Sequence, residues 1–200
     1  MIKLKLEVRR FSPGDDVPDD GILLIRHGPR TSPDIPPLSA MLTQSGIEAC
    51  QSLGALLHST PPIRLFSSPV KRCLDTGTYI VEGANWSLPV LPSEMLGDPG
   101  PFVIGKTNEA VNKLVAYAQE QNDWSFLHEH IAGGTVPGMR HRDVGAANLV
   151  EELYPSSPGY VLCISHDSII AAIIAAFGIN PDPWPDPLQG LIIQRSMSIE

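Results

Sequence analysis

Hydrophobic and polar residues alternate at the start of the chain, and short apolar runs follow at intervals. Residues 2–8 alternate apolar with charged side chains, and this period of two predicts a half-exposed strand. The runs at 22–25 and 160–164 are wholly apolar, which is typical of strands buried on both faces of a sheet. Shorter runs predict three further strands, the last of them antiparallel, at 63–66, 90–91 and 191–195.

Helical periodicity fills the segments between these strands. We predict helices over 43–58, 68–81, 107–121, 143–154 and 168–177. Thr43 favours an N-cap, Ser68 followed by Pro69 favours an N-cap and first helical position, and Gly178 favours the end of the last helix. Strands that alternate with helices predict an α/β fold, a three-layer α/β/α sandwich with a mainly parallel central sheet, in a single domain over 1–200.

The composition limits the partners and the compartment. The 200 residues are 42% hydrophobic and carry a formal net charge of −8, which argues against nucleic acid because a phosphate backbone needs a basic stripe. No apolar stretch reaches the roughly 18 residues of a membrane span, and the N-terminus lacks the apolar core of a secretory signal. Three cysteines without a CxxC motif are typical of buried thiols in a reducing compartment. We therefore expect a cytoplasmic protein with no membrane or nucleic-acid partner, and the oligomeric state stays open.

Basic and polar side chains follow three of the predicted strands at the point where each strand ends. They are Arg26 and His27, Ser67 and Ser68 with Arg72, and Ser165, His166 and Asp167. Ligands of open α/β sheets bind beyond the carboxyl ends of the strands, and two of these positions also open helices, whose N-terminal amides favour anions. Arginine can donate hydrogen bonds to two oxygens at once, and histidine can donate to oxygen or attack phosphorus. This inventory therefore indicates a site for a phosphoryl group.

Four segments, in order, resemble signatures of the histidine phosphatase superfamily. ILLIRHGPR resembles its RHG segment, LTQSGIEACQSLG its LTxxGxxQAxxLG helix, LFSSPVKRCLDTG its SSPxxRAxxTA segment, and VLCISHDSIIAAIIAAFG its second-histidine segment. The superfamily includes cofactor-dependent phosphoglycerate mutases, phosphohistidine phosphatases and histidine acid phosphatases. The resemblance spans residues 22–178 and implies a phosphoglycerate mutase-like fold.

The resemblance assigns a role to each matching residue. It implies that His27 is the nucleophile, that Arg26 and Arg72 hold the phosphate oxygens, and that His166 donates to the same phosphoryl group. Arg30 matches a further phosphate-contacting arginine of the acid-phosphatase branch, whose pattern is RHGxRxP, although here the proline comes one place late.

Two carboxylates compete as the proton donor to the leaving group. In the mutase-like branch the donor is a glutamate in a segment like LNExxxG, and LPSEMLG places Glu94 there with one residue fewer before the glycine. In the acid-phosphatase branch it is the aspartate of an HD pair, which Asp167 supplies unless it only caps the helix that follows. The SSPVKRC segment and the short chain favour the mutase-like branch, so we favour Glu94.

The resulting hypothesis is a metal-independent phosphatase that hydrolyses a phosphomonoester or a phosphohistidine through a phosphohistidine intermediate on His27. Its partner is a phosphorylated small molecule or a phosphoprotein, and no cofactor or metal is expected. The alternatives are a phosphoglycerate-type mutase and a non-catalytic phosphate- or phosphoprotein-binding module. Residues 97–142 are expected to form a pocket-covering insertion, and His128 and His130 within it are expected at the surface rather than on a metal.

Overall fold

A six-stranded mixed sheet forms the centre of the protein. The computed structural model describes residues 2–31, 39–97, 99–104 and 125–199. The strands are arranged in the order β1-β6-β2-β5-β3-β4. Their bounds are Ile2–Phe11 (β1), Gly21–Arg26 (β2), Arg64–Ser67 (β3), Val90–Pro92 (β4), Tyr160–Ser165 (β5) and Gly190–Ile199 (β6).

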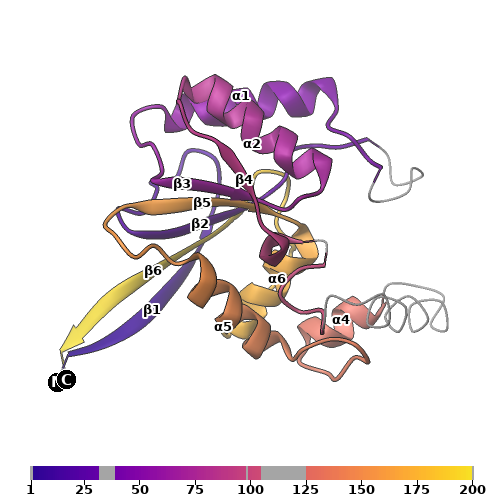
Figure 1. Ribbon diagram of the computed structural model, residues 1–200. Helices are drawn as coiled ribbons and strands as arrows, with labels where there is room; N and C mark the ends of the chain where they lie inside the picture. The colour runs from indigo at the N-terminus through magenta and orange to yellow at the C-terminus, as the bar shows by residue number, and fades with distance from the viewer. Residues whose placement is uncertain (1, 32–38, 98, 105–124, 200) are drawn as a thin grey trace.

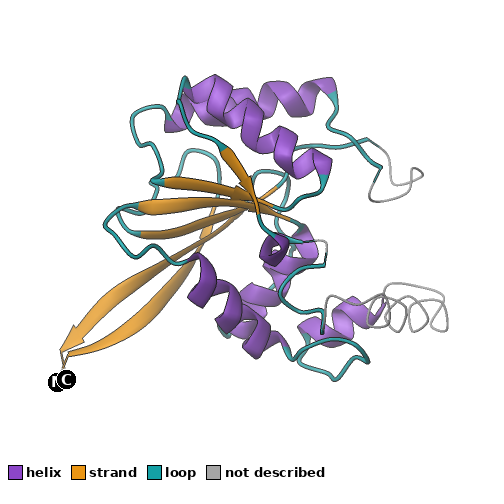
Figure 2. Ribbon diagram, in the orientation of Figure 1, coloured by secondary structure: helices purple, strands orange, loops and turns teal. Residues whose placement is uncertain are grey.

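Helices cover both faces of this sheet, which confirms the predicted α/β architecture (Figures 1 and 2). Helices α1 and α2 lie on one face, and α4, α5 and α6 lie on the other. Their bounds are Gln44–Leu57 (α1), Lys71–Ala84 (α2), Ser125–Ile131 (α4), Arg142–Leu153 (α5) and Asp167–Ala176 (α6). A short 3-10 helix, η1 (Glu94–Leu96), follows β4.

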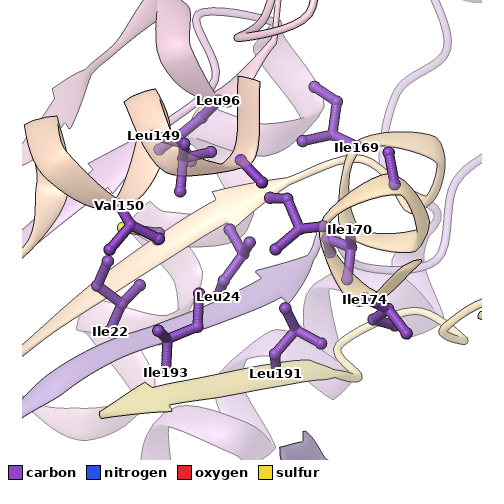
Figure 3. Packing of buried hydrophobic residues seen from close by; sticks show 14 of the residues in the cluster. Ile22, Leu24, Leu96, Leu149, Val150, Ile169, Ile170, Ile174, Leu191 and Ile193 are labelled. Atoms are coloured by element: carbon purple, nitrogen blue, oxygen red, sulfur yellow. The ribbon is translucent and has the colours of Figure 1, made fainter. Parts of the chain in front are cut away.

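The apolar run of β2 serves both layers of the core. Ile22 and Leu24 pack in the cluster under α5 and α6 (Figure 3), while Leu23 and Ile25 pack in the cluster under α1. All four side chains are fully buried. A strand that is covered on both faces needs apolar side chains at successive positions, because successive residues point to opposite faces.

Strand direction separates the sheet into two parts. Strands β2, β5, β3 and β4 pair in parallel, whereas β6 runs antiparallel to both β2 and β1. The antiparallel last strand is therefore confirmed. Strands β1 and β6 extend together beyond the other strands and carry the chain termini at their tip (Figure 1).

The start of α2 differs from the sequence prediction. The helix begins at Lys71 with Val70 as its N-cap, so Ser68 is not the cap. The Ser68 amide instead donates to the Ile164 carbonyl at 2.9 Å and prolongs the pairing of β3 with β5. Its hydroxyl accepts from the Val70 amide at 3.3 Å and forms the turn that leads into the helix.

The long segment between β4 and α5 is described in part. Helix α4 occupies a stretch for which the sequence pattern predicted no element, whereas the helix predicted over 107–121 lies outside the described residues. Within the described part of the chain, no helix is long and apolar enough to cross a membrane. All three cysteines are buried and free, as the odd count led us to expect.

Candidate active site

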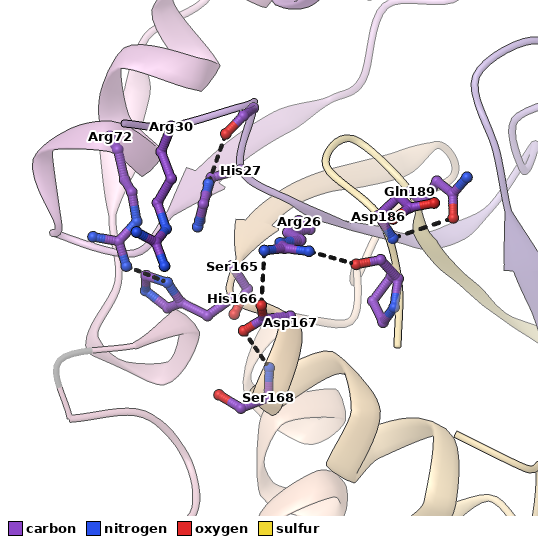
Figure 4. A network of polar contacts seen from close by, with 12 residues as sticks. Arg26, His27, Arg30, Arg72, Ser165, His166, Asp167, Ser168, Asp186 and Gln189 are labelled. Atoms are coloured by element: carbon purple, nitrogen blue, oxygen red, sulfur yellow. Dashed lines mark hydrogen bonds and ion pairs between the residues drawn. The ribbon is translucent and has the colours of Figure 1, made fainter. Parts of the chain in front are cut away.

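Strand pairing brings the three polar strand ends together. In the ladder, Arg26 of β2 lies opposite Ser165 of β5, and Ser67 of β3 lies opposite Ile164. The His27 amide continues this pairing by donating to the Ser165 carbonyl at 3.0 Å. The carboxyl ends of the three strands therefore form one edge, and the side chains that follow them converge there (Figure 4).

His27 is held as a neutral imidazole with a defined tautomer. Its side chain is buried, with 2% exposure, and its Nδ1 lies 2.8 Å from the Gly28 carbonyl oxygen. A carbonyl can only accept, so Nδ1 carries the proton and Nε2 keeps its lone pair. Burial lowers the pKa of His27 to about 3, and the charges of Arg72 and Arg26 add to this effect. Nε2 is therefore unprotonated at neutral pH.

Arg26 is fixed between the site and the loop before β6. One terminal nitrogen donates to the Pro185 carbonyl at 2.9 Å, and the other pairs with Asp167 at 2.8 Å (Figure 4). Its Nε is buried and has no hydrogen-bond partner among the described residues. A buried N–H donor of this kind costs free energy unless it is paired, and a bound oxyanion is a suitable acceptor.

Arg72 and Arg30 approach the histidines from the side of α2. Arg72 is buried in the first turn of α2, and Arg30 lies beside it after the RHG segment (Figure 4). Burial lowers the pKa of Arg72, and the charges of Arg30 and Arg26 act in the same direction. Three guanidinium groups thus share a small region, and an anionic group bound among them relieves their repulsion.

His166 faces His27 across the site. The two rings meet edge to face with their centroids 5.6 Å apart. His166 Nδ1 lies 3.1 Å from an Arg72 terminal nitrogen, and Nε2 lies 3.0 Å from the Ser68 hydroxyl. Burial lowers the pKa of His166 to about 3, followed by the charges of Arg72 and His27. Both histidines are therefore neutral in the unliganded protein.

The two candidate proton donors lie in different surroundings. Asp167 is the first residue of α6, where one carboxylate oxygen pairs with Arg26 and the other accepts the Ser168 amide at 2.8 Å. The N-cap position itself belongs to His166. Glu94 is exposed in η1 and lines a neighbouring hollow of about 640 Å³ together with Arg140 and Glu152.

The structure therefore gathers six of the seven predicted site residues. The charges that act on His27, His166 or Arg72 include those of Arg26, Arg30 and Asp167. Glu94 lines the adjoining hollow, and its short helix is anchored to the site because the Leu96 carbonyl accepts from Ser165 at 2.7 Å.

Two supporting residues escaped the sequence prediction. Thr76 accepts from the Gly28 amide at 3.0 Å and so fixes the loop that carries His27. It lies one helical turn after Arg72, and this i+4 spacing marks it as a neighbour of the site. Gly97 packs against His166, because a Cβ at this position would lie 2.5 Å from the imidazole ring. It directly follows η1, and its contact with His166 depends on the tertiary pairing of β4 with β3.

The surface position predicted for His130 is wrong. Its ring is buried against Phe102, and its Nε2 lies 2.9 Å from the Arg140 carbonyl, so this contact joins α4 to the loop before α5. His128 contacts the ring of Trp184. Among the described residues, no group of three histidine, cysteine or acidic side chains is placed to hold a metal ion.

The fold is an α/β fold that gathers arginine and histidine side chains at the carboxyl edge of the parallel strands of its sheet. A profile of the histidine phosphatase superfamily (branch 1) matches residues 22–189. The chain therefore belongs to the histidine phosphatase superfamily. No curated protein matches the chain.

Solved structures agree on the fold. The chain is similar to a phosphoglycerate mutase from Bacillus anthracis (14% identity, 90% of this chain and 94% of that chain covered, TM-score 0.56). It is similar to a mycobacterial glucosyl-3-phosphoglycerate phosphatase in complex with VO3 (21% identity, 90% of this chain and 98% of that chain covered, TM-score 0.56). It is also similar to an Escherichia coli protein provisionally described as an α-ribazole-5′-P phosphatase (17% identity, 88% of this chain and 95% of that chain covered, TM-score 0.59). The phosphoglycerate mutase-like fold is confirmed.

The neutral state of His27 has a measurable effect on stability. Its pKa is about 3 in the folded protein against the ordinary 6.5, so between these values the unfolded chain binds more protons and stability falls as the pH falls. We expect wild type to lose about 2 kcal/mol more unfolding free energy than His27→Gln between pH 7 and pH 5. Urea denaturation at both pH values measures this difference, and the pH-independent effect of the substitution cancels. Equal losses in the two proteins would show that His27 titrates normally.

Proposed function

We propose that this protein is a metal-independent phosphatase that forms a phosphohistidine on His27. The observation that carries the proposal is the neutral, buried His27 whose Nε2 is unprotonated beside three arginines. A histidine nucleophile needs that lone pair, and a phosphoryl group needs positive charge around its oxygens. Phosphatases and mutases of this superfamily share such chemistry, and we favour hydrolysis because the family's mutases have more basic substrate loops, whereas this chain carries 14 lysine and arginine residues.

The first step transfers the phosphoryl group to the protein. Nε2 of His27 attacks phosphorus in line with the ester bond, the P–O bond breaks, and the leaving oxygen takes a proton from the acid. Arg26, Arg30 and Arg72 neutralise the charge on the phosphoryl oxygens, and His166 donates to one of them. Guanidinium groups thus supply the positive charge that a divalent cation supplies in metal-dependent phosphatases.

The second step returns the phosphate to water. Water attacks the phosphohistidine and gives a proton to the carboxylate that the first step left behind, the P–N bond breaks, and Nε2 of His27 recovers its lone pair. Nδ1 keeps its proton and its hydrogen bond to the Gly28 carbonyl throughout, so the imidazole orientation is the same at the start and the end of the cycle. A mutase differs only in returning the phosphoryl group to a second hydroxyl.

We propose Glu94 as the proton donor and Asp167 as the residue that positions Arg26. Both oxygens of Asp167 already have partners, Arg26 and the Ser168 amide, and protonation would weaken both interactions. Glu94 is exposed in a hollow beside the site, where it can exchange protons with solvent. This choice agrees with the resemblance of LPSEMLG to the mutase-like branch.

The substrate is proposed to be a phosphorylated small molecule or a phosphoprotein. Two of the similar structures bear the names of phosphatases that act on small phosphorylated molecules, which supports the first class. Residues 97–142, as a pocket-covering insertion within one domain, are proposed to select the substrate. A cytoplasmic location fits three buried free thiols.

The proposed reaction predicts turnover that depends on His27 and not on a divalent cation. Purified protein should release inorganic phosphate from members of a panel of phosphorylated metabolites and phosphohistidine peptides, at the same rate with and without EDTA. His27→Gln should reduce kcat at least 10³-fold, roughly the loss that follows removal of a covalent nucleophile, while its circular dichroism matches wild type. Loss of activity in EDTA that magnesium restores would contradict the proposal, and transfer without phosphate release would indicate the mutase.

The proton donor is identified by its dependence on the leaving group. A general acid matters most when the departing oxygen is a poor leaving group, so Glu94→Gln should slow an alkyl phosphate at least tenfold more than nitrophenyl phosphate. Asp167→Asn should slow both esters alike, because it loosens Arg26 rather than removing the acid. Glu152→Gln, in the same hollow as Glu94, serves as the control and should leave both rates unchanged. Selective loss in Asp167→Asn alone would assign the proton to Asp167.

A further inference from the structure

The inner side of the His166 ring lies in a closed environment that the proposed reaction does not use. Nε2 lies 3.0 Å from the Ser68 hydroxyl and 3.7 Å from the Cys73 sulfur. Gly97 closes the space, since a Cβ there would lie within 2.9 Å of Ser68 and 2.6 Å of Nε2. Ser68 itself is fully buried. A hydroxyl in such a position has few possible partners, so its direction can be worked out.

The partners of His166 determine which nitrogen carries the proton. Arginine can only donate, so the contact between Arg72 and Nδ1 at 3.1 Å makes Nδ1 the acceptor. A neutral imidazole holds one proton, which is then on Nε2 and is donated to Ser68 Oγ. Ser68 Oγ also accepts from the Val70 amide at 3.3 Å, and the Ser68 hydroxyl bonds with Cys73. Ser68 thus acts as an acceptor toward His166.

We propose that Ser68 is a positioning residue for His166. The Ser68 hydroxyl accepts a hydrogen bond from Nε2–H, which keeps that proton on Nε2 and leaves Nδ1 as the nitrogen that donates to the bound phosphoryl group. This inference rests on the proposed function of the same site. Nδ1 accepts from Arg72 in the unliganded protein, and it needs a proton of its own to donate to a phosphoryl oxygen. Nδ1 gains that proton from solvent as the anion binds, Nε2 keeps its proton and its hydrogen bond to Ser68 Oγ, and His166 becomes an imidazolium.

The surrounding charges explain why proton uptake accompanies anion binding. The groups that face His166 are His27, Arg26, Arg72, Cys73 and Asp167. The two arginines oppose a positive imidazole, and a phosphoryl dianion among them reverses the local potential. An imidazolium has two N–H donors that need acceptors when buried, and Ser68 supplies the inner one.

The experiment measures the protonation of His166 by ¹⁵N NMR, with inorganic phosphate as the probe, in wild type, Ser68→Ala and Ser67→Ala. Ser67 is the matched control, because it is equally buried and its hydroxyl donates to the Ser68 carbonyl at 2.9 Å and to no other group among the described residues. In wild type and Ser67→Ala, we expect a proton on Nε2 alone without phosphate and on both nitrogens with phosphate. Ser68→Ala should lose the second state, and its kcat/KM should fall roughly 10- to 100-fold.

The outcomes separate this inference from the proposed function. An Nδ1 proton in unliganded wild type, or a Ser68→Ala protein with wild-type spectra and kcat/KM within twofold of Ser67→Ala, would overturn the role of Ser68 and leave the phosphatase proposal intact. The predicted spectra in a protein that hydrolyses neither a phosphomonoester nor a phosphohistidine peptide would support the role of Ser68 and overturn the proposed function. Because the wild-type spectra alone can refute the role of Ser68, the test does not depend on the folding of a variant.

Discussion

Parallel pairing of β5 with β2 on one side and β3 on the other is the constraint on which the site depends. The strand ends that carry His27, Arg72 and His166 are far apart in the sequence, and only this pairing puts them at one edge. Two backbone bonds extend the pairing past the strands, from His27 to Ser165 and from Ser68 to Ile164. The backbone of His27 and the backbone of Ser68, whose hydroxyl contacts His166, are thus continuations of the sheet.

The electrostatics of the site follow from that placement. At the strand ends, His27 is buried and His166 is half-buried, so removal from solvent makes both histidines neutral, and the arginines beside them favour the neutral form further. In the proposed reaction, neutral histidine carries the lone pair that attack on phosphorus requires, and the same arginines attract the phosphoryl group that is to be attacked. One arrangement therefore supplies both the nucleophile and the binding energy, at the cost of bringing several positive charges together in the unliganded protein.

Sequence patterns predicted the layers and the chemistry of this protein better than they predicted its local geometry. Wholly apolar strands such as residues 22–25 and the order of four signatures are local features, and both predictions were confirmed. The start of α2 was misplaced because Ser68 has the local chemistry of an N-cap, yet the ladder with β5 holds it in extended conformation. His130 was expected at the surface because its burial depends on Phe102, a distant loop residue. The strand order, which decides the neighbours of Glu94 and Gly97, is set by tertiary pairing that no local pattern contains.

The central claim is that His27 carries the phosphoryl group during turnover, and trapping that intermediate tests it most directly. Protein mixed with ³²P-labelled substrate, quenched in denaturant within milliseconds and digested should yield one labelled peptide, from the RHG segment. The account predicts label on His27 that is lost in acid and kept in base, and no label in His27→Gln. Turnover without such a label, or label on another residue in wild type, would contradict it.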